Sequence, residues 1–277
     1  MFFSFPSLQN FFTMNTILSC LGIFQYTISS YYETNYTANI LLTLGAFISR
    51  NYLLLNLVEY GTKNKKDISK YYTPRTKPIE DYKYEFHVNL VTTTSIECVT
   101  HIFIKHVVLK VGHHGPVNVY YDFCFFVPLS FLFEIIFDLL HYVSHRILHS
   151  KRFYKYCHKK HHKFSHPTTI TTFYQDPLDI LISNSIPTIV TLLFLPNISY
   201  FQFHLITVYK SFIEISGHCG KWSNPTTCFP QLMWFPKMLH IELYTEDHDR
   251  HHTENNCNYA KRFSLWDKAF GTYVSGK

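Results

Sequence analysis

Residues 131–149, FLFEIIFDLLHYVSHRILH, run from an apolar segment into a row of ionisable side chains. Asp138, His141, His145 and His149 stand at offsets 0, 3, 7 and 11, which places them on one narrow stripe of an α-helix. Two imidazoles four residues apart, such as His145 and His149, can chelate one metal ion from a single helix. Asp138 lies two turns before His145, where its carboxylate can accept the second ring N–H of a ligand and fix its tautomer. The stretch therefore predicts a helix that leaves an apolar layer and carries metal ligands at its end.

Histidine gathers twice more at helical spacing. The two further clusters share the pattern H-x-x-H-H and comprise His158, His161 and His162, and His248, His251 and His252. Each puts its imidazoles at i, i+3 and i+4, which we expect to share one helical face. The alternative interpretation is three solvated polar faces that use histidine as a neutral surface residue.

The donor type narrows the choice of metal. Imidazole nitrogen suits iron, zinc, copper and nickel, and the few carboxylates nearby argue against magnesium and calcium. Because a structural zinc takes four ligands, eight or more imidazoles are too many for one ion. The histidine pattern therefore predicts a site for two ions.

Apolar segments alternate with polar connections along the chain. The segments are Phe11–Tyr31, Ala38–Tyr60, Leu90–Val111, Tyr120–Leu140, Leu178–Leu195 and Ile198–Ile213. Connections without lysine or arginine are short, at 32–37, 112–119 and 196–197, whereas 61–86 and 150–163 are rich in both. Positive charge marks the cytosolic side of a membrane protein. We therefore expect an all-α integral membrane fold of three helical hairpins, with a cytosol-facing, His-rich helical cap. A soluble helical protein with very apolar core helices is the alternative.

Polar residues interrupt some of these segments. Arg50 and Asn51 lie inside the second, where a buried arginine is costly, so this helix is expected to tilt, snorkel or lie partly in the interface. The third contains Glu97, His101, Lys105 and His106 and by itself resembles an amphipathic interfacial helix. His204 and His240 lie outside the three histidine clusters, and we expect substitution there to be mild.

The composition excludes several classes of protein. The chain has 277 residues, of which 47% are hydrophobic and only 16% charged, so a disordered chain or a coiled coil is excluded. Its net charge of +6 lies in loops beside apolar segments, which fits an anionic membrane surface and not a nucleic-acid partner. Seven cysteines without a C-x-x-C pair predict no disulfide framework. The first residues lack a basic n-region, so no cleaved secretory signal is expected.

The three histidine clusters resemble the histidine boxes of the fatty acid hydroxylase superfamily, which holds sterol desaturases, methylsterol monooxygenases and lipid hydroxylases. We call residues 145–149, 158–162 and 248–252 the first, second and third box. The sequence around the boxes is similar to that family as well, in 141–146 (HYVSHR), 214–218 (EISGH), Asn258-Tyr259 and 265–272 (LWDKAFGT). The resemblance covers roughly residues 122–273; the first 110 or so residues match only in hydrophobic layout.

This resemblance implies an endoplasmic-reticulum membrane enzyme with a cytosolic centre of two iron ions that uses O₂. It implies a membrane-spanning region at 1–118 and a catalytic domain at 119–277. The implied ligands are His145, His149, His158, His161, His162, His248, His251 and His252, with His141 and His218 as additional ligands or close neighbours of ligands. Asp138 and Asn258 are expected to support the ligands from behind.

One position departs from the pattern of the family. Many relatives have His-Pro-Leu-Glu after the second box, where this chain has Asp176-Pro177-Leu178-Asp179. Asp176 then either replaces an imidazole at the metal or caps the helix that Pro177 begins. The capping role is the favoured one, because an acid or amide before an N-terminal proline is typical of a helix start.

Unactivated C–H bonds of lipids resist acids, bases and nucleophiles, so their oxidation requires metal and O₂ chemistry. The resemblance implies hydroxylation or desaturation of a lipid, with a sterol oxidised at a C4 methyl or at C5 as the first choice. A fatty acyl or sphingolipid hydroxylase is the alternative, and a membrane metal-binding protein or transporter is the non-enzyme alternative. No G-x-S-x-G or H-E-x-x-H is present, which argues against a serine hydrolase and a metalloprotease.

Electrons are expected from outside the chain, because no nucleotide-binding glycine motif occurs. The resemblance implies cytochrome b5 or a reductase as the donor. The basic segment 151–163 can dock an acidic donor or anionic lipid headgroups equally well.

Overall fold

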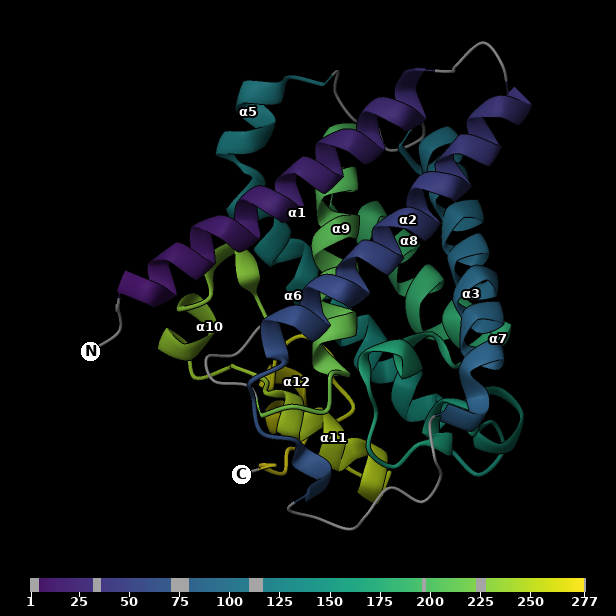
Figure 1. The fold of residues 1–277 in the computed structure, drawn as a ribbon, viewed down its shortest axis with the longest axis vertical. Coiled ribbons are helices and arrows are strands. Elements are labelled where there is room, and N and C mark those ends of the chain that lie inside the picture. The colour runs from purple at the N-terminus through teal and green to yellow at the C-terminus, as the bar shows by residue number, and fades with distance from the viewer. Residues whose placement is uncertain are drawn as a thin grey trace.

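The computed structural model describes residues 5–31, 36–70, 80–109, 117–195, 198–222 and 228–276, and these residues form helices and no named β-strand (Figure 1). The longer helices are α1 (Phe5–Tyr31), α2 (Tyr36–Thr62), α3 (Lys83–Phe103), α6 (Phe126–Leu148) and α9 (Tyr200–Gly217). The shorter ones are α5 (Val119–Cys124), α7 (Pro177–Ile180), α8 (Ile186–Phe194), α10 (Phe235–Met238), α11 (Thr245–Glu254) and α12 (Leu265–Ala269). The prediction of an all-α fold is confirmed.

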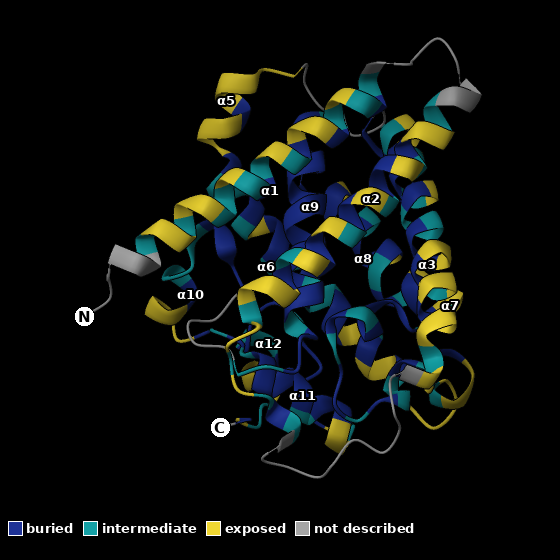
Figure 2. Cartoon of the chain, viewed as in Figure 1, coloured by how far each residue is buried: buried dark blue, intermediate teal, exposed yellow. Residues whose placement is uncertain are grey.

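Four helical segments are long and apolar enough to cross a membrane, namely Leu8–Ser30, Asn39–Thr62, Phe126–Leu148 and Pro177–Phe194. The last is one run made of α7, a π-helical turn at Leu181–Ser185, and α8. Large apolar side chains point outward from α1 and α2, with Phe12 and Leu41 both 64% exposed (Figure 2). An apolar exterior suits a lipid solvent, so the chain has the character of a multi-pass membrane protein.

Helix α9 forms the centre of the bundle and is buried along nearly its whole length (Figure 2). It begins at a capping box in which the Ser199 and Gln202 side chains each satisfy a backbone N–H of the other residue. The sequence predicted residues 198–213 to be a membrane leg like the others. Among the described helices α9 is not one of the four candidate spans, because polar residues such as Gln202, Lys210 and Glu214 interrupt it. Its apolar residues pack against α1, α2 and α6 inside one core.

The expectation for Arg50 needs correction. Arg50 neither snorkels nor faces an interface: it is 2% exposed and forms an ion pair with Glu97 of α3 at 2.6 Å. Its other guanidinium nitrogens donate to the side chains of Gln25 and Asn51. Helix α3 is likewise no isolated interfacial helix, since Leu90 and Cys98 are buried and Leu90 belongs to the main core. Paired polar groups thus hold α1, α2 and α3 together.

The histidine-rich part collects at one end of the bundle. Helices α11 and α12 lie at the lower end in Figure 1, beyond the ends of α6 and α9. The upper end holds the end of α1 and the start of α2. Most of the predicted hairpin turns, at 32–37, 112–119 and 196–197, lies outside the described residues.

Candidate metal centre

The first box lies at the end of α6, as its spacing predicts. His145 is in the last turn of the helix and His149 is its C-cap. The ring of His145 is buried, and its Nδ1 lies 2.7 Å from the backbone oxygen of Tyr259. A helix that is apolar for most of its length therefore presents two imidazoles to the cap.

The second and third boxes do not use one helical face each, contrary to the sequence prediction. The second box is divided between a π-helical turn ending at His158 and a 3₁₀ turn beginning at His161. The third box lies on α11, but its two adjacent rings at 251 and 252 point to different groups. The irregular backbone of the second box lets its rings diverge in the same way.

Two groups of imidazoles result. Cluster A consists of His145, His149, His158, His162 and His251, and cluster B consists of His161, His218, His248 and His252. In each cluster the candidate ligand atoms lie within 4.8 Å of one another. The clusters adjoin, since the ring centroids of His162 and His252 are 4.6 Å apart. Each cluster therefore collects rings from distant chain segments. The second and third boxes contribute rings to both clusters.

Ring tautomers are fixed by groups behind the rings. A backbone oxygen can only accept, so His145 must donate from Nδ1 to Tyr259, and His251 must donate from Nδ1 to the oxygen of Cys257 at 2.6 Å. His218 donates in the same way to the oxygen of Glu214 at 2.8 Å. The neutral ring then has a bare lone pair on Nε2, which is the form that binds a metal.

Bare nitrogens face one another across the clusters. The Nδ1 of His158 lies 2.8 Å from a carboxylate oxygen of Asp179, and its Nε2 lies 3.0 Å from Nε2 of His145. In cluster B the Nε2 atoms of His218 and His248 are also 3.0 Å apart. The lone pairs of His145 and His158 repel at this distance unless a cation lies between them. The spacing equals the ~3 Å that separates neighbouring nitrogens bound at right angles to an ion at ~2.1 Å.

Several ring nitrogens are buried without a hydrogen-bond partner among the described residues: Nε2 of His149 and His251, Nδ1 of His161, His162 and His248, and both nitrogens of His252. A buried polar atom without a partner is costly, so a set of them calls for a ligand. Burial lowers the pKa of His149 to about 2 and of His218 and His251 to about 3. The rings are therefore neutral at pH 7 and fit a transition-metal ion.

Acidic and amide side chains hold the loops that carry these acceptors. Asp267 accepts the backbone N–H groups of Tyr259 and Ala260, at 2.8 Å each. Asn258 donates to the backbone oxygens of Asp247 and Val274. The chain that follows is also attached to α11, because the N–H of Gly276 donates to the Asp247 carboxylate at 2.8 Å. The structure thereby fixes α11 and the Tyr259 carbonyl relative to α6.

Asp138 acts on the same loop. Its two carboxylate oxygens accept the backbone N–H groups of Lys261, Arg262 and Phe263, at 2.8 to 3.0 Å. The sequence analysis placed a ligand ring N–H at this carboxylate; the structure places three backbone amides there instead. Asp138 therefore orients the loop behind cluster A and no ring directly.

The carboxylate that contacts a ligand ring is Asp179, which the sequence analysis did not single out. Asp179 lies in α7, one turn after Asp176, and is 1% exposed. Asp176 is the N-cap residue of α7 and belongs to neither cluster; its side chain lies 3.8 Å from Nζ of Lys160. Asp176 thus occupies the expected cap position, but its side chain makes no capping hydrogen bond in the described structure. The signal available in the sequence was the acid at 179, where relatives carry glutamate.

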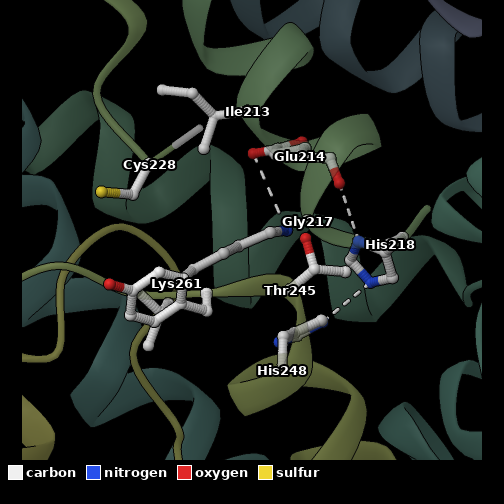
Figure 3. A pocket seen from close by; sticks show the side chains of 10 residues that line it. Ile213, Glu214, Gly217, His218, Cys228, Thr245, His248 and Lys261 are labelled. Atoms are coloured by element: carbon white, nitrogen blue, oxygen red, sulfur yellow. Dashed lines mark hydrogen bonds and ion pairs between the residues drawn. The ribbon is translucent and has the colours of Figure 1, made fainter. Parts of the chain in front are cut away.

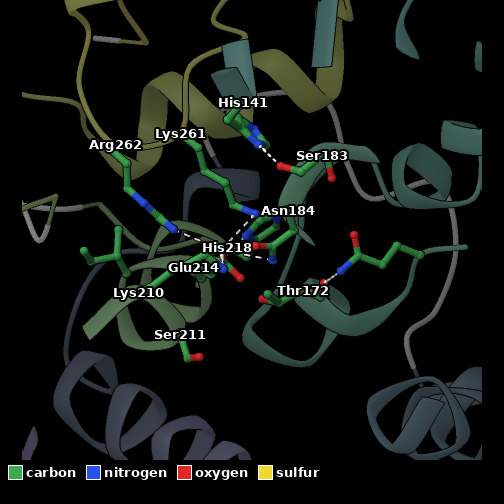
Figure 4. Close-up of polar contacts among 12 residues, drawn as sticks. His141, Thr172, Ser183, Asn184, Lys210, Ser211, Glu214, His218, Lys261 and Arg262 are labelled. Atoms are coloured by element: carbon green, nitrogen blue, oxygen red, sulfur yellow. Dashed lines mark hydrogen bonds and ion pairs between the residues drawn. The ribbon is translucent and has the colours of Figure 1, made fainter. Parts of the chain in front are cut away.

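The structure separates the two histidines whose role was open. His218 joins cluster B (Figure 3). His141 belongs to neither cluster: it donates to the backbone oxygen of Ser183 in the π-helical turn at 2.6 Å (Figure 4). A further buried pair, His166 and Asp249 at 2.6 Å, anchors α11 and was not anticipated.

A buried charge group supports cluster B from the side of α9. The carboxylate of Glu214 lies 3.0 Å from Arg262 and 3.1 Å from Lys210 (Figure 4). Arg262 is fully buried and also pairs with Glu134 of α6 at 2.7 Å. Because Glu214 also supplies the backbone oxygen for His218, these pairs fix the end of α9 at the cluster.

His204 is not the neutral control that its position outside the boxes predicts. It is fully buried, its Nδ1 lies 3.1 Å from Gln25, and its Nε2 lies 3.1 Å from His101. His240, by contrast, is exposed and serves as the better control.

Comparison with known proteins agrees with the three boxes. A sequence model described as "Fatty acid hydroxylase" matches residues 130–272. Methylsterol monooxygenase 1 of Rattus norvegicus is 33% identical over 142 residues, covering 50% of this chain and 44% of that protein. Fatty acid hydroxylase vlmA of Lecanicillium sp is 30% identical, covering 51% and 40%, and C-4 methylsterol oxidase erg25 of Schizosaccharomyces pombe is 30% identical, covering 51% and 45%. The matched part thus spans less than half of each relative. No solved structure matches the chain.

Proposed function

The chain belongs to the fatty acid hydroxylase family, and on that premise we propose that it is an O₂-dependent membrane oxidoreductase that hydroxylates or desaturates a lipid C–H bond. Its proposed substrate is a sterol, oxidised at a C4 methyl group or at C5. Two of the three relatives above are named as methylsterol-oxidising enzymes, and this supports the sterol. The proposed division of the chain is a membrane-spanning region at 1–118 and a catalytic domain at 119–277.

The observation that carries the proposal is the pair of adjoining clusters with inward-facing, neutral imidazoles. Cluster A would hold one iron ion and cluster B a second, with Asp138, Asn258 and His141 supporting their surroundings. Bound iron would supply the O₂ activation and hydrogen abstraction that no side chain can provide.

The protein's own residues would prepare and protect this site. The carbonyls behind His145, His218 and His251 keep each Nε2 free of a proton, and burial keeps the rings neutral. The enclosing helices exclude water, which would otherwise quench a reactive oxidant. Thr245 and Lys261 line the small cavity beside His218 and His248 (Figure 3), where their polar groups would hold water.

Hydroxylation consumes two electrons and two protons for each O₂, and we propose cytochrome b5 or a reductase as the source of the electrons. The segment between the first two boxes exposes Lys151, Arg152, Lys155 and Lys159. These cations follow His149 directly and suit an acidic donor surface. The cap would then face the cytosol from the endoplasmic-reticulum membrane. Reversing the charges of Lys151, Lys155 and Lys159 should lower the electron-transfer rate and leave bound iron unchanged.

Two other functions compete. A fatty acyl or sphingolipid hydroxylase is supported by the likeness to fatty acid hydroxylase vlmA. A membrane metal transporter would carry its ligands along a path inside the spans. Here eight of the nine clustered imidazoles come from outside the four candidate spans, among them His149 just after the end of one, which favours a fixed site in the cap.

The test is a measurement of iron and turnover on the same sample. Purified protein should contain close to two irons and oxidise a 4-methylsterol or a C5-saturated sterol in the presence of O₂ and a reductase system. Lipid profiling of cells with and without the protein identifies the product. Protein that binds iron but oxidises only acyl lipids would replace the sterol proposal, and protein without iron or turnover would refute the enzyme.

A further inference from the structure

A large cavity lies away from the histidines, at the cap end of α1 and α2. Its volume is about 420 Å³, which is within the range of small-molecule sites, whereas the cavity in Figure 3 holds about 20 Å³. Apolar side chains form most of its lining, among them Met14, Ile17, Leu57 and Phe212. Helices α1 and α2, which lie outside residues 130–272, form two sides of this cavity.

The cavity and cluster B share a wall. Phe212 and Ser216 of α9 line the apolar cavity, while Ile213 and Gly217 line the small cavity beside His218 and His248. The loop after α9 contributes in the same way, with Cys228 on the small cavity and Pro230 on the large one. Only the last turns of α9 and this loop therefore lie between the apolar cavity and the imidazoles.

The one charged side chain of the cavity lies at the end nearest the histidines. Lys65 is its one charged lining residue and follows α2 directly. The chain beside it is bonded to the segment after His218: the N–H of Ile68 donates to the oxygen of Gly220 at 3.0 Å, and Asp67 pairs with Lys221 at 3.1 Å. Ile17 of α1 and Leu57 of α2 lie further from the cap end. An occupant with one polar end would thus place that end near cluster B.

We propose that this cavity binds the body of the sterol substrate, with its hydroxyl-bearing ring toward Lys65 and Ser216 and its tail toward Ile17 and Leu57. A single cation among amide and hydroxyl groups suits one small polar head, whereas a phosphate head requires more positive charge. Competition with a fatty acid separates a hydroxyl head from a carboxylate head. This inference rests on the proposed function for its link to catalysis, but the binding site can be tested without turnover.

Two glycines of α2 provide a matched pair of variants. A Cβ added at Gly61 or at Gly45 meets no atom within 4 Å, so either position accepts a side chain without a clash. Gly61 lines the cavity and Gly45 does not. Gly61→Leu should fill the cap end of the cavity, and Gly45→Leu introduces the same change in the same helix elsewhere.

The experiment is photolabelling of the full-length protein with a clickable sterol that carries a diazirine on its ring system or on its tail. The ring probe should label residues 61–65 or 212–216, and the tail probe should label Ile17 or Leu57. Gly61→Leu should weaken labelling by about tenfold, since it displaces one or two buried methylene equivalents of the ligand, and Gly45→Leu should not.

Equal labelling of wild type and Gly61→Leu would overturn the site, as would labelling spread over the lipid-facing side chains of α1 and α2. Displacement by a fatty acid and not by unlabelled sterol would overturn the sterol class. Reversed ring and tail patterns would overturn the orientation. Iron content of the same samples separates the two proposals: labelling without iron would refute the proposed function and leave the sterol site standing.

Discussion

The protein buries polar side chains in two regions, and the two differ in how those groups are satisfied. In the bundle, Arg50 directs its guanidinium to Gln25, Asn51 and Glu97, and Asn51 in turn donates to Thr94. In the cap, seven ring nitrogens of the two clusters are buried without a partner among the described residues. The first pattern is typical of groups that hold helices together, and the second of groups that await a ligand. Unpaired ring nitrogens thus distinguish the two clusters from the Arg50 network.

Removing one ring from a cluster should have the largest effect. His251→Ala in cluster A and His161→Ala in cluster B should each abolish turnover and reduce iron to one ion per chain or fewer, because each deletes a ligand. Iron per chain by mass spectrometry and turnover by product analysis measure this. His240→Ala, at an exposed residue, should behave as wild type. Full activity in either cluster variant would end the metal assignment.

Acid should destabilise the cap of the metal-free protein. His218 and His251 have pKa values of about 3 when folded, below the unfolded value of about 6.5, so the folded state binds fewer protons between these limits. Stability is then full above pH 6.5 and falls as the pH drops, by on the order of 2 kcal/mol per ring at pH 5. Thermal unfolding at pH 7 and pH 5 measures the difference. Stability that rises on acidification would contradict neutral buried rings.

Breaking the bundle network should cost stability and spare the metal. Arg50→Met leaves the Glu97 carboxylate without its guanidinium partner and should lower the free energy of unfolding by roughly 3 kcal/mol. Iron content of the folded fraction should stay unchanged, since no cluster ring contacts Arg50. A variant that keeps its stability but loses iron would reverse the roles assigned to the two regions.

The carboxylate behind a ligand should have an intermediate effect. Asp179→Asn removes the anionic acceptor of the His158 ring and should weaken metal binding by about 10-fold to 100-fold. Competition with a chelator gives the affinity. Asp176→Asn is the matched control one turn away and should change the affinity little, because Asp176 belongs to neither cluster.

The smallest effect is expected where the network is only hydrogen-bonded. His204→Gln keeps one amide to meet Gln25 or His101 and should cost about 1 kcal/mol of stability, with iron unchanged. An unchanged melting temperature would support the expectation from the sequence that substitution of His204 is mild.

Helical periodicity was enough to predict the all-α fold and the gathering of imidazoles into more than one group. The stripe 138–149 is helical as expected, and nine of the ten proposed ligands gather in two clusters. What periodicity missed depends on contacts between distant segments. It could not assign His161 and His162 to different clusters, because a π-turn and a 3₁₀ turn replace the expected helix. It could not show that Asp138 binds three amides of a loop 123 to 125 residues away, or that Arg50 is paired inside the bundle.

The attachment of the last described residues to α11 has a practical consequence for purification. Gly276 packs so closely that an added Cβ would lie 2.3 Å from the backbone of Glu246, and its N–H and that of Val274 are bound by Asp247 and Asn258. A protease that trims residues 274–276, or an affinity tag fused immediately after them, would pull on the helix that carries the third box. Protein purified through a tag at the other end of the chain should retain more bound metal than protein purified through a tag at this end.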